Sequence, residues 1–199
     1  KSYLKIAWRN LSKNKGYSAI NIGGLAIGMT CFLLIAMFIK NELSYDSYHE
    51  KGDRIFRIVH HGSENNLEDQ WIWGNAPVGP ALKSDFPEVL EIVQFSGRSD
   101  VLLEYNERSF QESNCFYMDP TVFDVFTWPL ISGNPDTALE APYSIVLTES
   151  TAKKYFGDED PMGKAIEGVG GRANDGVYTV TGIIKDVPSN SHFNFDVLM

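Results

Sequence analysis

The chain has 199 residues and a formal net charge of −9 at pH 7. Residues 1–19 hold five basic and no acidic side chains, whereas residues 40–199 hold 12 basic and 26 acidic ones. Phosphate groups would repel so acidic a region, which argues against nucleic-acid binding. The two cysteines, Cys31 and Cys115, fall in different parts of the chain, so there is no disulfide framework.

The first predicted element is a basic amphipathic helix over residues 2–14. Its apolar residues recur at helical spacing, at Tyr3, Leu4, Ala7, Trp8 and Leu11. A basic helix that contains tryptophan and adjoins an apolar segment is typical of the inner membrane interface. Trp8 and Arg9 are therefore predicted to belong to an interfacial helix that Gly16 ends. A plain basic flank that only sets orientation is the alternative, but charge does not account for the apolar stripe.

Residues 20–39 are predicted to form a transmembrane helix. They are twenty consecutive residues without a charge, and a helix of that length reaches about 30 Å, the thickness of a bilayer's hydrocarbon core. A cleaved signal peptide is disfavoured, because its apolar region would cover roughly 7 to 15 residues and end at an Ala-x-Ala-like site. Basic residues stay on the cytoplasmic side of a span, which predicts a cytoplasmic N-terminus and an exported acidic region.

Gly24 and Gly28 stand four residues apart within this segment. Two glycines on one helix face let another helix approach closely, which predicts packing against further spans. The motif is short, and glycine is frequent in membrane helices, so a chance occurrence is the alternative.

Residues 40–199 are predicted to fold as an α+β domain with a mixed sheet and helices. Alternating or β-branched residues predict strands over 54–59, 101–105, 109–117, 144–147 and 178–185, the second and third forming a hairpin. Helices are expected over 77–86, 119–126 and 148–156. Asp119 and Thr148 are the expected N-caps of the last two, and Gly157 is the expected stop signal of the final one.

No motif in the chain predicts a catalytic, cofactor or metal site. Residues 157–165 are not a phosphate-binding loop, because five residues separate the glycines, alanine follows the lysine, and a helix rather than a strand precedes them. The histidines lack metal-ligand spacing, and the acids at 158–160 lack the alternating oxygens of a calcium loop. Residues 186–192 include Asp, Ser and His but are too local for a triad, and they are predicted to form a structured turn. Cys115 is predicted to be a small buried hydrophobe.

Three segments, in order along the chain, resemble the FtsX-like permease family, whose exterior region is the MacB-like periplasmic core domain. Residues 6–28 include the run Asn-Ile-Gly-Gly-Leu, residues 146–164 include Gly-Asp-Glu-Asp-Pro-Met-Gly-Lys, and residues 178–192 include Asp-Val-Pro-Ser-Asn-Ser. The resemblance covers essentially the whole chain.

The resemblance implies the permease subunit of an ABC transporter system, not an enzyme. A separate ATPase subunit would bind ATP, so this chain would hold no cofactor. The other implied partners are membrane lipid, a second permease in a homodimer or pseudo-dimer, and a periplasmic partner. Residues 1–19 would be cytoplasmic, 20–39 would span the bacterial inner membrane, and 40–199 would form a periplasmic core domain, incomplete at its C-terminal end.

Such subunits are thought to transmit ATP-driven motion to the exterior domain, for drug or peptide export, lipoprotein release or control of cell-wall hydrolases. Two alternatives stay open. An anchored binding or regulatory module that recruits cell-wall hydrolases would bind its partner regardless of ATP. A signal-anchored exterior enzyme would need a pocket with perturbed acids.

Overall fold

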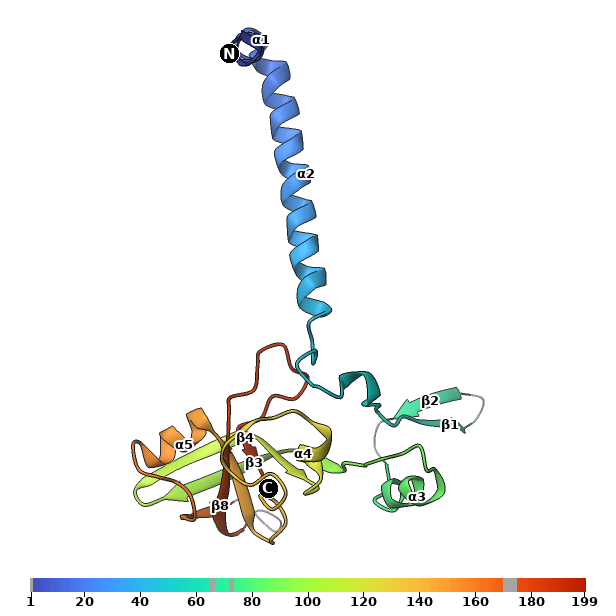
Figure 1. Ribbon diagram of the computed structural model, residues 1–199, viewed down its shortest axis with the longest axis vertical. Coiled ribbons are helices and arrows are strands. Elements are labelled where there is room, and N and C mark those ends of the chain that lie inside the picture. Colours follow the sequence, from blue (N-terminus) through green and yellow to red (C-terminus); the bar gives the residue numbers. More distant parts are fainter. Residues whose placement is uncertain (1, 65–66, 72–73, 170–174) are drawn as a thin grey trace. The chain divides into compact units, whose positions relative to one another are not determined.

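The computed structural model describes residues 2–64, 67–71, 74–169 and 175–199. The chain divides into two compact units, Lys1–Tyr45 and Asp46–Met199. The first unit is helical and the second is the α+β domain (Figure 1).

The first unit consists of helices α1 (Ser2–Lys13) and α2 (Lys15–Glu42). The predicted amphipathic helix is present, but Gly16 lies inside α2 and does not end α1. The break falls at Asn14, whose φ of −110° and ψ of 56° are not helical. The Ser18 hydroxyl bridges it by donating to the Leu11 carbonyl at 3.1 Å. The apolar residues 20–39 lie within α2.

The second unit is built on a mixed sheet of seven strands in the order β5-β8-β6-β9-β4-β3-β7. These strands are β3 (Phe95–Tyr105), β4 (Arg108–Met118), β5 (Leu130–Gly133), β6 (Ser144–Thr148), β7 (Ala165–Val169), β8 (Gly176–Ile184) and β9 (Val197–Leu198). Strand β7 also pairs with β8, so the sheet closes into a ring, and β5 extends it along β8. The pairs β4–β9 and β6–β8 are parallel and the others are antiparallel, which confirms the predicted mixed sheet.

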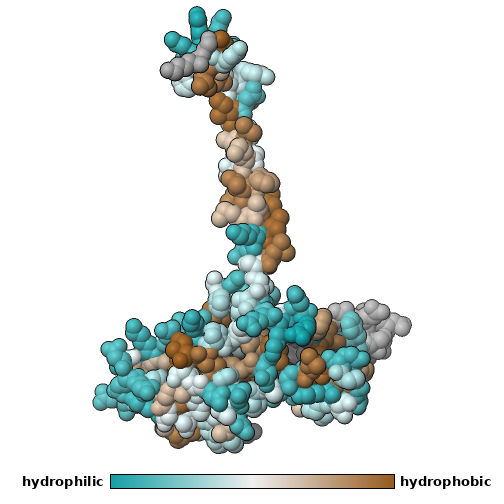
Figure 2. All heavy atoms as spheres, viewed as in Figure 1, coloured by the Kyte–Doolittle hydropathy of each residue, from teal (hydrophilic) through white to brown (hydrophobic). Residues whose placement is uncertain are grey.

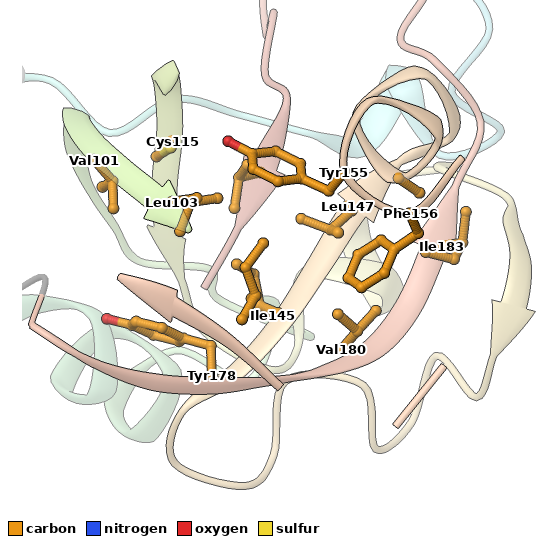
Figure 3. Packing of buried hydrophobic residues seen from close by; sticks show 13 residues of the cluster. Val101, Leu103, Cys115, Ile145, Leu147, Tyr155, Phe156, Tyr178, Val180 and Ile183 are labelled. Atoms are coloured by element: carbon orange, nitrogen blue, oxygen red, sulfur yellow. The ribbon is translucent and has the colours of Figure 1, made fainter. Parts of the chain in front are cut away.

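The ring strands all contribute buried residues to one hydrophobic cluster, the ring core. Its members from the strands are Val101, Leu103, Cys115, Ile145, Leu147, Ile166, Tyr178, Val180, Ile183 and Val197. Helix α5 (Glu149–Phe156) closes this cluster with Ala152, Tyr155 and Phe156, and Figure 3 shows the labelled side chains converging beneath it. Cys115 is fully buried, as its prediction required.

A second cluster, the outer core, packs on the other side of β6. Val146 points into it, between Ile145 and Leu147 of the ring core, as expected for a strand buried on both faces. Helix α4 (Val122–Val125) contributes Val122 to this cluster. The remaining buried members are Met118, Phe126, Trp128, Ala138, Leu139, Ile184, Phe195 and Leu198.

Helix α5 follows its predicted signals. The Thr148 hydroxyl accepts a hydrogen bond from the backbone N–H of Thr151 at 3.4 Å, as an N-cap does. Gly157 ends the helix with a φ of +66°, a conformation that glycine adopts without a Cβ penalty.

Two other predictions are wrong. Residues 54–59 form no strand: Arg54 ends the 3-10 helix η1 (Gly52–Arg54), and the hairpin of β1 (His60–Glu64) and β2 (Leu67–Trp71) begins only afterwards. Ile55 packs against the outer core, but Phe56 is 84% exposed, and no strand pairs with residues 54–59 within the described part of the chain.

The helix predicted over 119–126 is also shorter, because α4 begins after Thr121. Asp119 does not cap it, since its carboxylate instead accepts from the backbone N–H of Gln94 at 2.9 Å. Helix α3 (Val78–Asp85), by contrast, lies where it was predicted and ends before Pro87.

Candidate functional site

The segment that directly follows the helical unit is bonded to the loop before β9. Asp46 is its central residue: its backbone N–H donates to the Asn190 carbonyl at 3.0 Å. Its carboxylate accepts from the His192 N–H at 3.0 Å and the Ser191 hydroxyl at 3.2 Å. Its second oxygen lies 2.5 Å from Nδ1 of His192. We call the set Asp46, Tyr48, His49, Thr127, Trp128, Ser191 and His192 the Asp46 clamp.

Asp46 is conformationally and electrostatically suited to this role. Its φ of 52° is in the left-handed region, which aspartate tolerates better than most residues. Burial by itself would raise the pKa of Asp46, but the hydrogen bonds and charge of His192, with the bond from Ser191, together hold that pKa below its usual value. The carboxylate is therefore charged at neutral pH, and it links the segment after α2 to the loop before β9.

Tyr48 joins the clamp to the outer core. Its hydroxyl lies 2.8 Å from the Ser191 hydroxyl and accepts from the indole N–H of Trp128 at 3.1 Å. Trp128 stacks on Phe126 with ring centroids 4.8 Å apart and meets Phe195 edge-on at 4.7 Å. A displacement of Tyr48 would therefore act directly on buried aromatic residues.

His49 is the most buried titratable group of the clamp, with 7% of its surface exposed. Its Nδ1 accepts from the backbone N–H of Thr127 at 3.0 Å, which places the ring proton of the neutral imidazole on Nε2. Burial lowers the pKa of His49, and the nearby Asp46 carboxylate offsets only part of that shift. The ring packs against Tyr48 and Phe126, with centroids 4.1 Å and 5.2 Å away.

A second buried polar network lies beneath α5 and holds this helix to β4. The Glu112 carboxylate accepts from the Lys154 ammonium and the Tyr155 hydroxyl, each at 2.6 Å. Burial, with Glu112 and other nearby acids, raises the pKa of the Cys115 thiol to about 12, so this thiol is protonated at neutral pH and is no nucleophile. Within the described residues no group of His, Cys, Asp and Glu could hold a metal ion.

The residues singled out in the helical unit are exposed. Trp8 is 75% exposed, and a Cβ added to Gly24 or Gly28 would meet nothing within 4 Å. Within the described residues α2 is the one helix long and apolar enough to cross a membrane, and Figure 2 shows the hydrophobic side chains along it. The roles of Gly24 and Gly28 in helix packing, and of Trp8 and Arg9 at an interface, stay predictions.

The clamp was not predicted from the sequence. The turn at 186–192 was expected, and the Ser191 hydroxyl does accept from the N–H of Phe193 at 3.2 Å. Its partner Asp46, however, is 146 residues from His192, and no spacing pattern connects them. The burial of His49 also escapes the sequence, because nothing near this residue marks a buried position.

One helix long and apolar enough to cross a membrane, followed by an α+β domain with a closed mixed sheet, is the arrangement of a membrane-anchored domain. The chain belongs to the family of the MacB-like periplasmic core domain, whose model matches residues 18–199. This confirms the resemblance to FtsX-like, MacB-like permeases. Members of this family are components of permeases.

One solved structure supports the same fold. The chain is similar to a domain assigned to a permease protein of Porphyromonas gingivalis, with 25% identity and a TM-score of 0.56, covering 70% of this chain and 59% of that one. It is also similar to the periplasmic region of MacB from Actinobacillus actinomycetemcomitans, with 22% identity and a TM-score of 0.41, covering 54% of this chain and 46% of that one.

A third similar structure is the extracellular domain of the noncanonic ABC-type transporter YknZ from Gram-positive bacteria, with 18% identity, a TM-score of 0.40, and coverage of 53% of this chain and 52% of that one. The chain thus spans less than two thirds of the length of each of these relatives. No curated protein matches it.

Proposed function

We propose that the chain is part of the permease subunit of an ABC transporter system, in which a separate ATPase subunit binds and hydrolyses ATP on the cytoplasmic side. In this proposal α2 spans the inner membrane, the N-terminus is cytoplasmic and the acidic domain is periplasmic. Family membership supports the permease role. The basic residues before α2 and the acidic composition after it support the orientation.

Motion of α2 is transmitted to the exterior domain through the Asp46 clamp, and this contact carries the proposal. Asp46 follows the end of α2, at Glu42, by four residues in the chain. Its bonds to Ser191 and His192 attach that segment to the loop that continues into β9. Strand β9 lies between β4 and β6 in the ring, so a pull on Asp46 reaches the sheet through hydrogen bonds rather than through a flexible tether.

The helical unit supplies the membrane contacts of the proposal. Helix α1 lies in the lipid interface, with Trp8 among the lipid headgroups and Arg9 on its basic side. The open surface at Gly24 and Gly28 receives another span, from this permease or from its partner in a homodimer or pseudo-dimer.

The test begins with the full-length parent protein, purified in detergent with its candidate ABC ATPase. Stable assembly with ATP turnover, lost when the catalytic glutamate of the ATPase is removed, is the expected result. Failure to associate with any ABC ATPase would overturn the proposal and favour an anchored regulatory module or enzyme.

Asp46→Ala tests the transmission step in the same complex. Loss of partly exposed, charge-assisted hydrogen bonds of about 1–2 kcal/mol should raise the open fraction of the clamp roughly tenfold. We expect ATP turnover to persist while the ATP-dependent change in hydrogen exchange of residues 186–198 is lost. Asp46→Asn, which retains an acceptor and tolerates the positive φ, should show a weaker effect, and the exposed Asp158→Asn should behave as wild type. An unchanged ATP response in Asp46→Ala would exclude the clamp as the transmitting contact.

A further inference from the structure

His49 holds the clamp to the outer core in a way that depends on its charge state. Its Nδ1 accepts the Thr127 N–H at 3.0 Å, which only a neutral imidazole can do. A protonated ring carries hydrogens on both nitrogens, so Nδ1–H would then face the Thr127 N–H. On the other side of the ring, Nε2 is buried and has no hydrogen-bond partner among the described residues, so no acceptor there would stabilise a charged ring.

We propose that His49 is a proton-controlled latch: protonation of its imidazole breaks the contact with Thr127 and frees residues 49–51 from the connection between α4 and β5. Within the described residues, two further hydrogen bonds hold this segment. The Glu50 N–H donates to the Thr127 hydroxyl at 2.9 Å, and the Lys51 ammonium donates to the Asp124 carbonyl. Release of His49 leaves these two exposed contacts to hold the segment.

The surrounding charges set the direction of the switch. Asp46 and Tyr48 flank His49 on its own segment, Glu50 and Lys51 follow it, Asp124 lies on α4, and His192 lies on the facing loop. Of these, Asp46 acts on the imidazole electrostatically and favours its charged form, but desolvation is the larger effect and lowers the pKa of His49 from 6.5. Neutral His49 therefore stabilises the fold fully above pH 6.5, and this contribution is lost as the pH falls below that value.

Acid does not release the whole clamp. The bonds that the Asp46 carboxylate accepts from the Ser191 hydroxyl and the His192 N–H do not involve the His49 ring. Asp46 therefore remains attached while His49 leaves, so the segment pivots about Asp46 instead of dissociating. The regulatory consequence, weaker transmission at acidic pH, rests on the proposed function, whereas the opening of the latch does not.

The test is hydrogen exchange at the Thr127 amide, measured on the chain in detergent at about pH 8 and about pH 5 and corrected for the intrinsic exchange rate. We expect wild-type protection at Thr127 to fall about threefold to tenfold on acidification, the effect of losing one hydrogen bond. Protection at the Asp46 amide should stay within about twofold. His49→Asn retains an acceptor near the Nδ1 position and cannot titrate, so its Thr127 protection should not depend on pH. His61→Asn, which removes an exposed imidazole elsewhere, should respond as wild type.

Constant wild-type protection, or the same acid response in His49→Asn, would overturn the latch. If His49→Asn does not fold, an NMR titration of wild-type His49 decides: the Thr127 amide shift must follow the same midpoint as the imidazole, and independent midpoints would contradict the proposal. The proposed function is judged separately, by assembly and ATP turnover at pH 8, where the latch is closed.

Discussion

Glu112 is a charged residue that the domain buries, with 5% of its surface exposed. Its carboxylate is bonded to Lys154 and Tyr155 of α5, so it fixes this helix over the ring core. Removing one member of a buried polar network leaves its partners unsatisfied, which costs about 1–3 kcal/mol. We therefore expect Glu112→Ala to lower the free energy of unfolding of the exterior domain by that amount, as measured by urea denaturation of the chain in detergent.

The exposed pair Lys83–Glu91 provides the control, because the Lys83 side chain is 46% exposed and surface ion pairs contribute less than about 1 kcal/mol. Lys83→Ala should therefore change the unfolding free energy less than Glu112→Ala. Equal losses in the two variants would show that the Glu112 network contributes no more than a surface pair.

At the scale of elements, the pairing of β5 with β8 depends on a glycine. Gly133 has a φ of +102°, and a Cβ there would lie 2.5 Å from the Thr181 carbonyl oxygen and 2.9 Å from Cα of Gly182. Gly133→Ala should cost about 1–3 kcal/mol in backbone strain, with the clash against β8 added. Gly163→Ala is the matched control, since Gly163 has a φ of +73° but open space around it. If the unfolding free energy fell equally in both variants, β8 would have to move away from the added Cβ without any cost in free energy.

Elements with strong local signals were predictable. The hairpin of β3 and β4, strands β6 and β8, and helix α5 lie where alternation, β-branched residues and the Thr148 cap place them. Strand β9 has only two residues, Val197 and Leu198, which is too short for any period to show. It is a strand because β4 and β6 leave a gap that it fills, and that information is not local.

The clamp escapes prediction for the same reason. Asp46 and His192 are ordinary loop residues until the fold brings them together, and their polar character is equally expected of exposed loops. The failure at 54–59 is the converse case, because an alternating pattern without a facing sheet does not make a strand. The resemblance to permeases indicated the family but not the contacts of Asp46.

In the molecule as a whole, residues 186–196 connect Asp46 to strand β9 along the proposed transmission path. At one end Ser191 and His192 hold Asp46; at the other, β9 completes the ring. Between them Phe195, which is 2% exposed, packs on Trp128 of the clamp. The loop is therefore held by partly exposed hydrogen bonds at Asp46 and by a buried aromatic contact at Phe195, and loosening Phe195 should loosen the clamp as well as the domain.

Comparing Phe195→Ala with Leu103→Ala distinguishes a local effect on the clamp from a general loss of stability. Both truncate fully buried residues and should each lower the unfolding free energy by several kcal/mol, about 3–5 for Phe and 2–5 for Leu. Leu103 lies in the ring core, away from the clamp, whereas Phe195 lies in the outer core beside Trp128. At matched global stability, hydrogen exchange at the Asp46 amide should be faster in Phe195→Ala than in Leu103→Ala. Equal exchange at the Asp46 amide in the two variants would mean that the clamp is held by its own hydrogen bonds. A displacement of the clamp would then not reach the ring through the outer core.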